Sequence, residues 1–274
     1  MPNFAILLPP AEGKQEGGNP FAPDMFDYRS SSTFNYFKDL NPERRALIDA
    51  LQRVIRESDE ATLEKIFGVK GETLEEAIRV NLDIYQAPLM SALDRYGPGV
   101  LYKAMDFAGL PTGAQRRLLE QGIIFSGLFG LLRPDDLIPN YRLRMDAVLP
   151  GVGKVSQYWR PHVSRVLNEQ LRGSYVWNLL PGAHQEAWDD AHTYAEMVQV
   201  KFFVEKGGER KPVSHGVKTL RGRLVNFIVR ETLEDYEPLL DWEHPDGYRV
   251  DEEASTYDPE TRTRTLVMVR REDG

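Results

Sequence analysis

The chain has 274 residues and not one of them is cysteine. Structural disulfides, thiolate zinc sites, iron–sulfur clusters and cysteine nucleophiles are therefore excluded. The absence of cysteine fits a reducing compartment. Long hydrophobic runs are also missing, because the first run, Phe4 to Leu8, is too short for a signal peptide or a membrane span. We expect a cytoplasmic protein with no membrane partner.

Basic residues are fewer than acidic ones. The 34 Lys and Arg residues stand against 42 Asp and Glu residues, which gives a formal net charge of −8. This balance argues against a protein that coats nucleic acid by neutralising phosphates over its whole surface. Basic residues do gather in KTLRGRLVNFIVR, directly before an acidic segment. Any anion-binding surface must therefore be local.

Familiar catalytic and metal motifs are absent from the sequence. It contains no dinucleotide-binding G-x-G-x-x-G, no Walker loop, no H-E-x-x-H, no G-x-S-x-G and no EF-hand loop. The histidines do not show metal-ligand spacing; they are His162, His184, His192, His215 and His244. We expect no metal and no cofactor, and the sequence identifies no catalytic residue.

The apolar pattern predicts strands and helices that alternate along the chain. Short buried strands are expected at FAILL and at IIFSG, and a Gly-Gly hairpin at EKGGER. Helices are expected at 42–55, 59–67, 73–82, 90–96, 154–171 and 215–233, with two short ones between 97 and 121. Because there is no regular βαβ period, we predict an α/β (α+β) fold, one domain over residues 1–274 with a mixed sheet surrounded by helices.

Three short segments place polar side chains after an expected strand or opposite an apolar helix face. The first is LLPPAEGK, in which two prolines stiffen the exit from the strand and Glu12 and Lys14 follow. Ligands of α/β sheets bind at the carboxyl ends of the strands. An ordinary surface turn explains this segment equally well.

The second segment is FSGLFGLLRPDDLIPNYRLRM, residues 125–145. We expect GLFGLL to form one or two helical turns that end at Arg133, because the residue before a proline is biased out of the α region. Arg133 and Arg142, with Tyr141 beside them, carry donor groups suited to a carboxylate or phosphate. An Arg–Asp network that holds the loop to the body is an equally good interpretation.

The third segment is SHGVKTLRGR, residues 214–223. On a helix, Lys218 lies one turn from Arg221 and Gly222, whereas Arg223 points elsewhere. A glycine inside a helix costs about 1 kcal/mol relative to alanine, so we expect another chain or a ligand to approach closely at Gly222. A solvated basic face is the alternative.

Together and in this order, these segments resemble the peroxide-stress protein YaaA family of bacteria. The resemblance extends over YWRPHVSRVLNEQL, WNLLPGAHQEAW and GYRVDEE, and so over nearly the whole chain. It implies a fold described as a cantaloupe, with a positively charged cleft. It also implies cytoplasmic protection against hydrogen peroxide and free iron, and binding to DNA with help from a helix-hairpin-helix element.

Carried over by position, the resemblance implies a cleft for DNA or a small anion. Its residues would be Lys14, Ser126, Gly127, Arg133, Tyr141, Arg142, Lys218, Gly222 and Arg223, and Arg221 would join them in neutralising phosphates. The helix-hairpin-helix candidate is DFAGLPTGAQRRLLEQG, whose backbone amides, Arg116 and Arg117 would face a phosphate. It lacks the usual second glycine. The first motif has AEGK where many members have AKT, and the third lacks a pair of adjacent lysines, which weakens the DNA interpretation.

Three functional hypotheses follow. The protein binds duplex or distorted DNA; or it is an enzyme for a small anionic substrate; or it handles iron without catalysis. The enzyme hypothesis uses Glu12, Lys14, Arg133, Asp136, Tyr141, His215 and Lys218. The iron hypothesis uses Asp189, Asp190, Asp251, Glu252 and Glu253. The sequence does not predict the oligomeric state.

Overall fold

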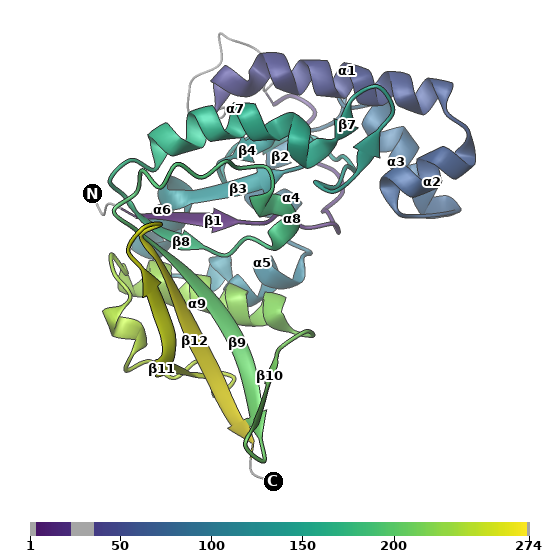
Figure 1. The fold of residues 1–274 in the computed structure, drawn as a ribbon. Coiled ribbons are helices and arrows are strands. Elements are labelled where there is room, and N and C mark those ends of the chain that lie inside the picture. The colour runs from purple at the N-terminus through teal and green to yellow at the C-terminus, as the bar shows by residue number, and fades with distance from the viewer. Residues whose placement is uncertain (1–3, 23–35, 273–274) are drawn as a thin grey trace.

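The structure is a computed structural model that describes residues 4–22 and 36–272. Its main strands are β1 (Phe4–Leu8), β3 (Gly122–Ser126), β4 (Gly130–Leu132), β8 (Tyr175–Asn178), β9 (Glu196–Lys206), β10 (Glu209–Pro212), β11 (Arg249–Asp258) and β12 (Thr263–Glu272). They form one sheet in the order β11-β12-β9-β8-β1-β3-β4, with β10 paired to β9 (Figure 1). Two small sheets pair β2 (Met90–Ser91) with β5 (Leu137–Ile138) and β6 (Val148–Leu149) with β7 (Gly153–Lys154).

Helices occupy much of the remaining described chain. They are α1 (Asn41–Glu57), α2 (Glu60–Phe67), α3 (Glu72–Leu82), α4 (Ala92–Arg95), α5 (Val100–Met105), α6 (Thr112–Gln121), α7 (Val155–Gln170), α8 (Gly182–Gln185) and α9 (Val217–Glu231). Short 3-10 helices are η2 (Lys38–Leu40), η3 (Phe107–Gly109) and η4 (Glu237–Leu239). The prediction of an α/β protein with a mixed sheet and surrounding helices is confirmed. The single-domain boundaries and the cantaloupe description stay predictions.

The centre of the sheet is parallel. β1 pairs in parallel with β3 on one side and β8 on the other, and β9 pairs in parallel with β8 and β12. All five residues of β1 are buried, as expected for a strand with helices on both faces. Helix α6 packs against β1 and β3, whereas α7 lies over β4 on the other face (Figure 1).

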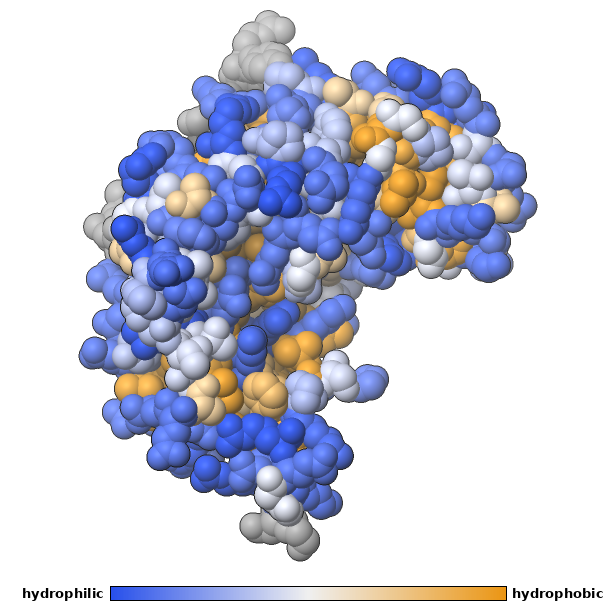
Figure 2. All heavy atoms as spheres, viewed as in Figure 1, coloured by the Kyte–Doolittle hydropathy of each residue, from blue (hydrophilic) through white to orange (hydrophobic). Residues whose placement is uncertain are grey.

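The strand order reverses at β1. The chain passes from β1 to β3 on one side and returns to β8 on the other, so the loops that follow these strands diverge at their carboxyl ends. This is the position at which open α/β sheets bind ligands. Figure 2 shows the surface hollowed between the part formed by α2 and α3 and the far end of β9 and β10, on the side toward which β1 points in Figure 1.

The prediction that GLFGLL is helical is wrong. Residues 127–129 form a turn, and Gly130–Leu132 is β4, which runs antiparallel to β3. The hydroxyl of Ser126 accepts hydrogen bonds from the backbone N–H of Leu128 at 3.3 Å and of Phe129 at 3.1 Å. This side-chain turn, with Gly130 at φ +69°, reverses the chain before a helix can begin.

The close approach expected at Gly222 is made by another part of the chain. A Cβ added to Gly222 would collide with the carbonyl oxygen of Leu101 and lie 2.8 Å from the Cβ of Ala104. Both neighbours belong to α5. The missing side chain therefore lets α9 pack directly against the backbone of α5.

Candidate functional site

Lys14 lies just beyond the carboxyl end of β1. Its Nζ is 4.4 Å from the centre of the Tyr141 ring and 5.9 Å from that of Tyr96. The buried guanidinium of Arg95 holds the segment that carries Lys14, because it donates hydrogen bonds to the carbonyl oxygens of Gln15 and Gly17. The turn predicted from LLPPAEGK is therefore fixed from inside the protein.

Three hydroxyls from distant segments meet beneath Lys14. The hydroxyl oxygen of Tyr141 lies 2.6 Å from that of Tyr96 and 2.8 Å from that of Ser126. Both tyrosines and Ser126 are buried. Burial raises the pKa of Tyr141 to about 12, so its phenol is protonated at neutral pH. We call Tyr96, Ser126 and Tyr141 the hydroxyl cluster.

Arg142 is placed by Asn81 of α3. The side chain of Asn81 accepts a hydrogen bond from the backbone N–H of Arg142 at 3.1 Å and donates one to its carbonyl oxygen at 2.8 Å. This pair fixes the backbone beside Tyr141. Among the described residues, the Nε of Arg142 is buried and has no hydrogen-bond acceptor. An unused guanidinium donor costs free energy unless a ligand or solvent accepts it.

A pocket of about 260 Å³ brings the first and second motifs together. Its lining residues are Glu12, Gly13, Lys14, Glu16, Thr73, Glu76, Ala77, Val80, Asn140, Tyr141 and Arg142. Lys14, Tyr141 and Arg142 are buried or half-buried, whereas Glu12, Glu16 and Glu76 are exposed. We call this the Lys14 pocket, with a floor of two cations and a rim of three carboxylates.

The charge state of Lys14 follows from this environment. Burial lowers the pKa of Lys14 to about 7; the charges of Arg142 and Arg95 act in the same direction, and that of Glu12 opposes them. A cation is poorly solvated there and meets two other cations. Near neutral pH, the Lys14 side chain is therefore divided between ammonium and neutral amine.

Arg133 contacts the protein itself. Its guanidinium donates two hydrogen bonds to the carbonyl oxygen of Leu119 in α6, at 2.9 and 2.6 Å, and its backbone N–H donates to the buried carboxylate of Asp136 at 2.7 Å. The interpretation of Arg133 as a residue that holds the loop accounts for these contacts. Neither Arg133 nor Asp136 lines the Lys14 pocket.

Gly127 also has a packing role. A Cβ added there would lie 2.9 Å from the backbone carbon of Arg144, and the Gly127 carbonyl oxygen accepts a hydrogen bond from the indole N–H of Trp159 at 2.8 Å. The glycine brings the turn after β3 against the segment that follows Tyr141. It thus supports the pocket without lining it.

The third motif is divided between the surface and the interior. Lys218 is exposed. Burial lowers the pKa of His184 in α8 to about 4, and the nearby charge of Lys218 acts in the same direction. Arg223 forms an ion pair with Asp246 at 2.6 Å. The Nε of Arg221 is buried without an acceptor among the described residues. None of these side chains lines the Lys14 pocket.

The helix-hairpin-helix candidate, residues 106–122, contains η3 and α6 and directly follows α5. Arg117 donates hydrogen bonds to the carbonyl oxygens of Val229 at 2.7 Å and Arg230 at 3.2 Å, so it caps the end of α9. Arg116 is exposed and pairs with Glu120. Only one of the two predicted phosphate ligands thus faces solvent.

The residues that sequence reasoning missed come from the helices before β3. Asn81 lies in the helix expected at 73–82, and Arg95 and Tyr96 lie in the one expected at 90–96. The sequence indicates no functional role for these residues, yet they position Lys14 and Arg142. Their contacts span 45 to 78 residues along the chain. No local motif marks such contacts in a single sequence.

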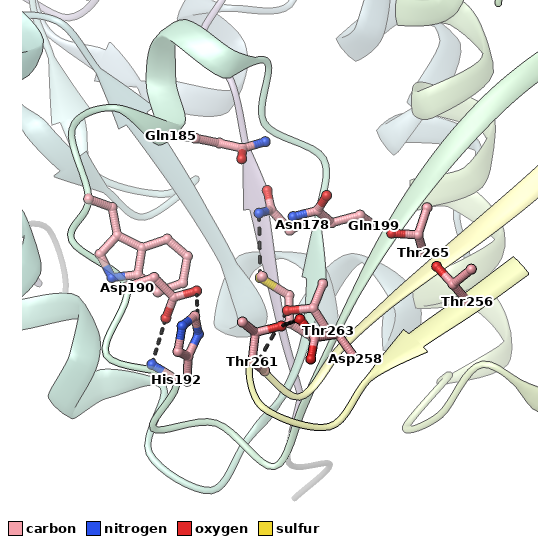
Figure 3. Close-up of a pocket in the computed structure, with 12 residues that line it drawn as sticks. Asn178, Gln185, Asp190, His192, Gln199, Thr256, Asp258, Thr261, Thr263 and Thr265 are labelled. Atoms are coloured by element: carbon pink, nitrogen blue, oxygen red, sulfur yellow. Dashed lines mark hydrogen bonds and ion pairs between the residues drawn. The ribbon is translucent and has the colours of Figure 1, made fainter.

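A second pocket, of about 370 Å³, lies over β8, β9, β11 and β12 (Figure 3). Asp190 of the iron hypothesis lines it and bonds within the protein, to the hydroxyl of Tyr194 at 2.8 Å and the backbone N–H of His192 at 2.8 Å. Within residues 4–22 and 36–272, no group of three or more His, Asp or Glu residues is arranged to hold a metal ion. In the same ranges, no helix combines the length and apolar character that a membrane span needs.

Comparison of the sequence with known proteins places the chain in a family. Residues 4–254 match the family described as peroxide stress protein YaaA. A UPF0246 protein of Streptomyces coelicolor is 32% identical over 252 residues, which covers 91% of this chain and 92% of that protein. An uncharacterized protein of Campylobacter jejuni is 29% identical over 237 residues, covering 86% and 88%. A UPF0246 protein of Corynebacterium glutamicum is 33% identical over 229 residues, covering 81% and 84%. The chain therefore belongs to the peroxide stress protein YaaA family, whose name supports a role in the response to peroxide.

Proposed function

We propose that the protein is a cytoplasmic enzyme of the peroxide response that acts on a small anionic substrate bound in the Lys14 pocket. The observation that carries this proposal is Arg142, which lines the pocket beside Lys14 and whose buried Nε has no acceptor among the described residues. Guanidinium groups bind carboxylates and phosphates through such donors. The position at the carboxyl ends of β1 and β3 is the usual one for ligands of open α/β sheets.

The size and charge of the Lys14 pocket favour a small ligand over DNA. Its volume of about 260 Å³ lies near the lower end of small-molecule sites. The exposed carboxylates of Glu12, Glu16 and Glu76 would repel a polyanion that covers the whole rim. A small anion can bind beside Lys14 and Arg142 without covering the exposed carboxylates of the rim.

Isothermal titration calorimetry with glyoxylate and with inorganic phosphate tests the proposal. We expect saturable binding of at least one of these anions to the wild-type chain, weakened about ten-fold or more in Arg142→Gln. Arg53→Gln is the matched control, since Arg53 is an exposed arginine of α1 outside the pocket lining. No binding of either anion, or equal loss in both variants, would reject the Lys14 pocket as an anion site.

DNA binding is the second candidate, and the exposed hairpin before α6 favours it. Pro111, Thr112 and Gly113 are exposed at the start of α6, and Lys103 and Arg116 are exposed nearby. Backbone N–H groups at a helix start, with flanking cations, bind phosphate. Binding there would shield DNA from hydrogen peroxide and free iron, the protection that the resemblance implies.

Fluorescence anisotropy with a labelled duplex tests the DNA candidate. Binding through this hairpin should weaken steeply between low and moderate salt, because counterions are released from the phosphates. Lys103→Glu combined with Arg116→Glu should abolish it, while Arg53→Glu should leave it nearly unchanged. Binding that the double variant retains would exclude the hairpin as the DNA surface.

A further inference from the structure

We propose that Lys14 is a nucleophilic amine that forms an imine with a small anionic aldehyde or ketone. This inference rests on the proposed function, because it names the chemical class of the substrate bound in the same pocket. It assigns separate roles to three neighbours: Lys14 makes the bond, Arg142 holds the anionic group, and Tyr141 supplies a proton.

The surroundings of Lys14 are those of an amine rather than of a structural ion pair. Among the described residues, its Nζ has no carboxylate partner, and its hydrogen bond is to the carbonyl oxygen of Glu12 at 3.4 Å. The ring of Tyr141 lies on one side, 4.4 Å away. Arg142 and Arg95 disfavour a further positive charge. Desolvation beside another cation is a known means of activating a lysine nucleophile.

Arg142 sets the substrate class. Lys14 and Arg142 line one pocket of about 260 Å³, and the buried Nε of Arg142 has no acceptor among the described residues. A compound that fits this volume and satisfies both groups carries a carbonyl carbon for Lys14 and, a few bonds away, a carboxylate or phosphate for Arg142. A neutral carbonyl compound would leave the arginine donor without its acceptor.

The reaction needs no oxidant, reductant or metal. The lone pair of Nζ attacks the carbonyl carbon and forms a C–N bond, while the C=O electron pair moves to oxygen, which takes up a proton. Nitrogen releases one proton, which gives the neutral carbinolamine. The carbinolamine hydroxyl then takes up a second proton and leaves as water as the C–O bond breaks, while nitrogen releases its second proton, so amine and carbonyl give imine and water. We assign the first proton, the one that the carbonyl oxygen takes up, to Tyr141, because its ring lies 4.4 Å from Nζ and its hydroxyl bonds to those of Tyr96 and Ser126, which can restore the proton.

Reductive trapping on the whole protein tests the imine. Glyoxylate and cyanoborohydride at pH 7 should add one carboxymethyl group, which peptide mapping places on Lys14. About half of Lys14 is the neutral amine at this pH. An ordinary lysine is neutral to less than about 0.1%. A less basic amine is also a weaker nucleophile. Allowing for this, we expect Lys14 to react at least about ten times faster than the exposed Lys103 and Lys218.

Two comparisons separate site chemistry from general lysine reactivity. Arg142→Gln should slow trapping of glyoxylate about five-fold or more while leaving trapping of neutral acetaldehyde unchanged, and Arg53→Gln should alter neither. Lys14→Arg should remove the adduct from that peptide. The imine is rejected if Lys14 of the wild-type chain reacts no faster than Lys103. If glyoxylate then still binds in an Arg142-dependent manner, the imine fails and the proposed function stands.

Discussion

The hydroxyl oxygens of Tyr96 and Tyr141 are 2.6 Å apart in a buried hydrogen bond that joins two segments 45 residues apart. This contact ties the end of α4 to the loop that carries Arg142. It also places two aromatic rings beneath the amine of Lys14. The part of the chain that positions the candidate nucleophile is thus also part of the core.

Tyr141→Phe keeps the ring beneath Lys14 but removes the centre of the hydroxyl cluster. The hydroxyls of Tyr96 and Ser126 then lose a buried partner, and we expect a loss of about 1–3 kcal/mol in the free energy of unfolding, measured with urea. Tyr85→Phe removes an exposed hydroxyl that bonds to Asp49, and should change stability by less than about 0.5 kcal/mol. Equal effects of the two changes would contradict this account.

Gly222→Ala tests the contact between α9 and α5. Alanine gains about 1 kcal/mol in helix propensity, yet its Cβ would meet the backbone of Leu101. We expect the clash to win, with a net destabilisation of about 1–3 kcal/mol in thermal or urea unfolding. Gly182→Ala is the control, because nothing lies within 4 Å of the added Cβ. A more stable Gly222→Ala variant would show that α5 yields easily.

Lys14→Met tests the lowered pKa of Lys14 through its effect on stability. The Lys14 pKa is about 7 in the folded chain, against 10.5 as the ordinary value. Between these pH values the unfolded chain holds a proton that the folded chain lacks, so the free energy of unfolding of the wild type rises with pH in this window. The stability advantage of Lys14→Met over the wild type should therefore be largest at pH 6 and smaller at pH 9. A difference between Lys14→Met and the wild type that does not change with pH would contradict the lowered pKa.

Arg133→Gln separates support of the loop from ligand binding. The change removes two hydrogen bonds to the carbonyl oxygen of Leu119, and we expect a loss of about 1–3 kcal/mol in unfolding free energy. Glyoxylate affinity at a temperature where the variant is folded should stay within about two-fold of the wild type. A specific loss of affinity without loss of stability would instead assign Arg133 to the ligand.

The apolar pattern predicts most of the elements because its period marks the buried face of a helix or strand within a short stretch of sequence. There are exceptions. The helix expected at 90–96 begins with strand β2 (Met90–Ser91). At β4, an apolar run as short as GLFGLL does not distinguish a strand from a helix, and the turn depends on the hydroxyl of Ser126. Lys14 and Arg142 could be selected as candidates from their residue types and their place after strands. The contributions of Asn81, Arg95 and Tyr96 could not, because each acts across dozens of residues in a folded chain.

Arg95 donates hydrogen bonds to the carbonyl oxygens of Gln15 and Gly17, and these bonds hold the segment that carries Lys14. Burial is the main cause of the low pKa of Lys14, and it depends on this segment staying in place. If the segment opens, the amine returns to water and regains its ordinary basicity. The pKa of Lys14 thus reports whether the amino-terminal segment is packed against the rest of the protein. A pH titration of the Lys14 side chain can measure it without any substrate.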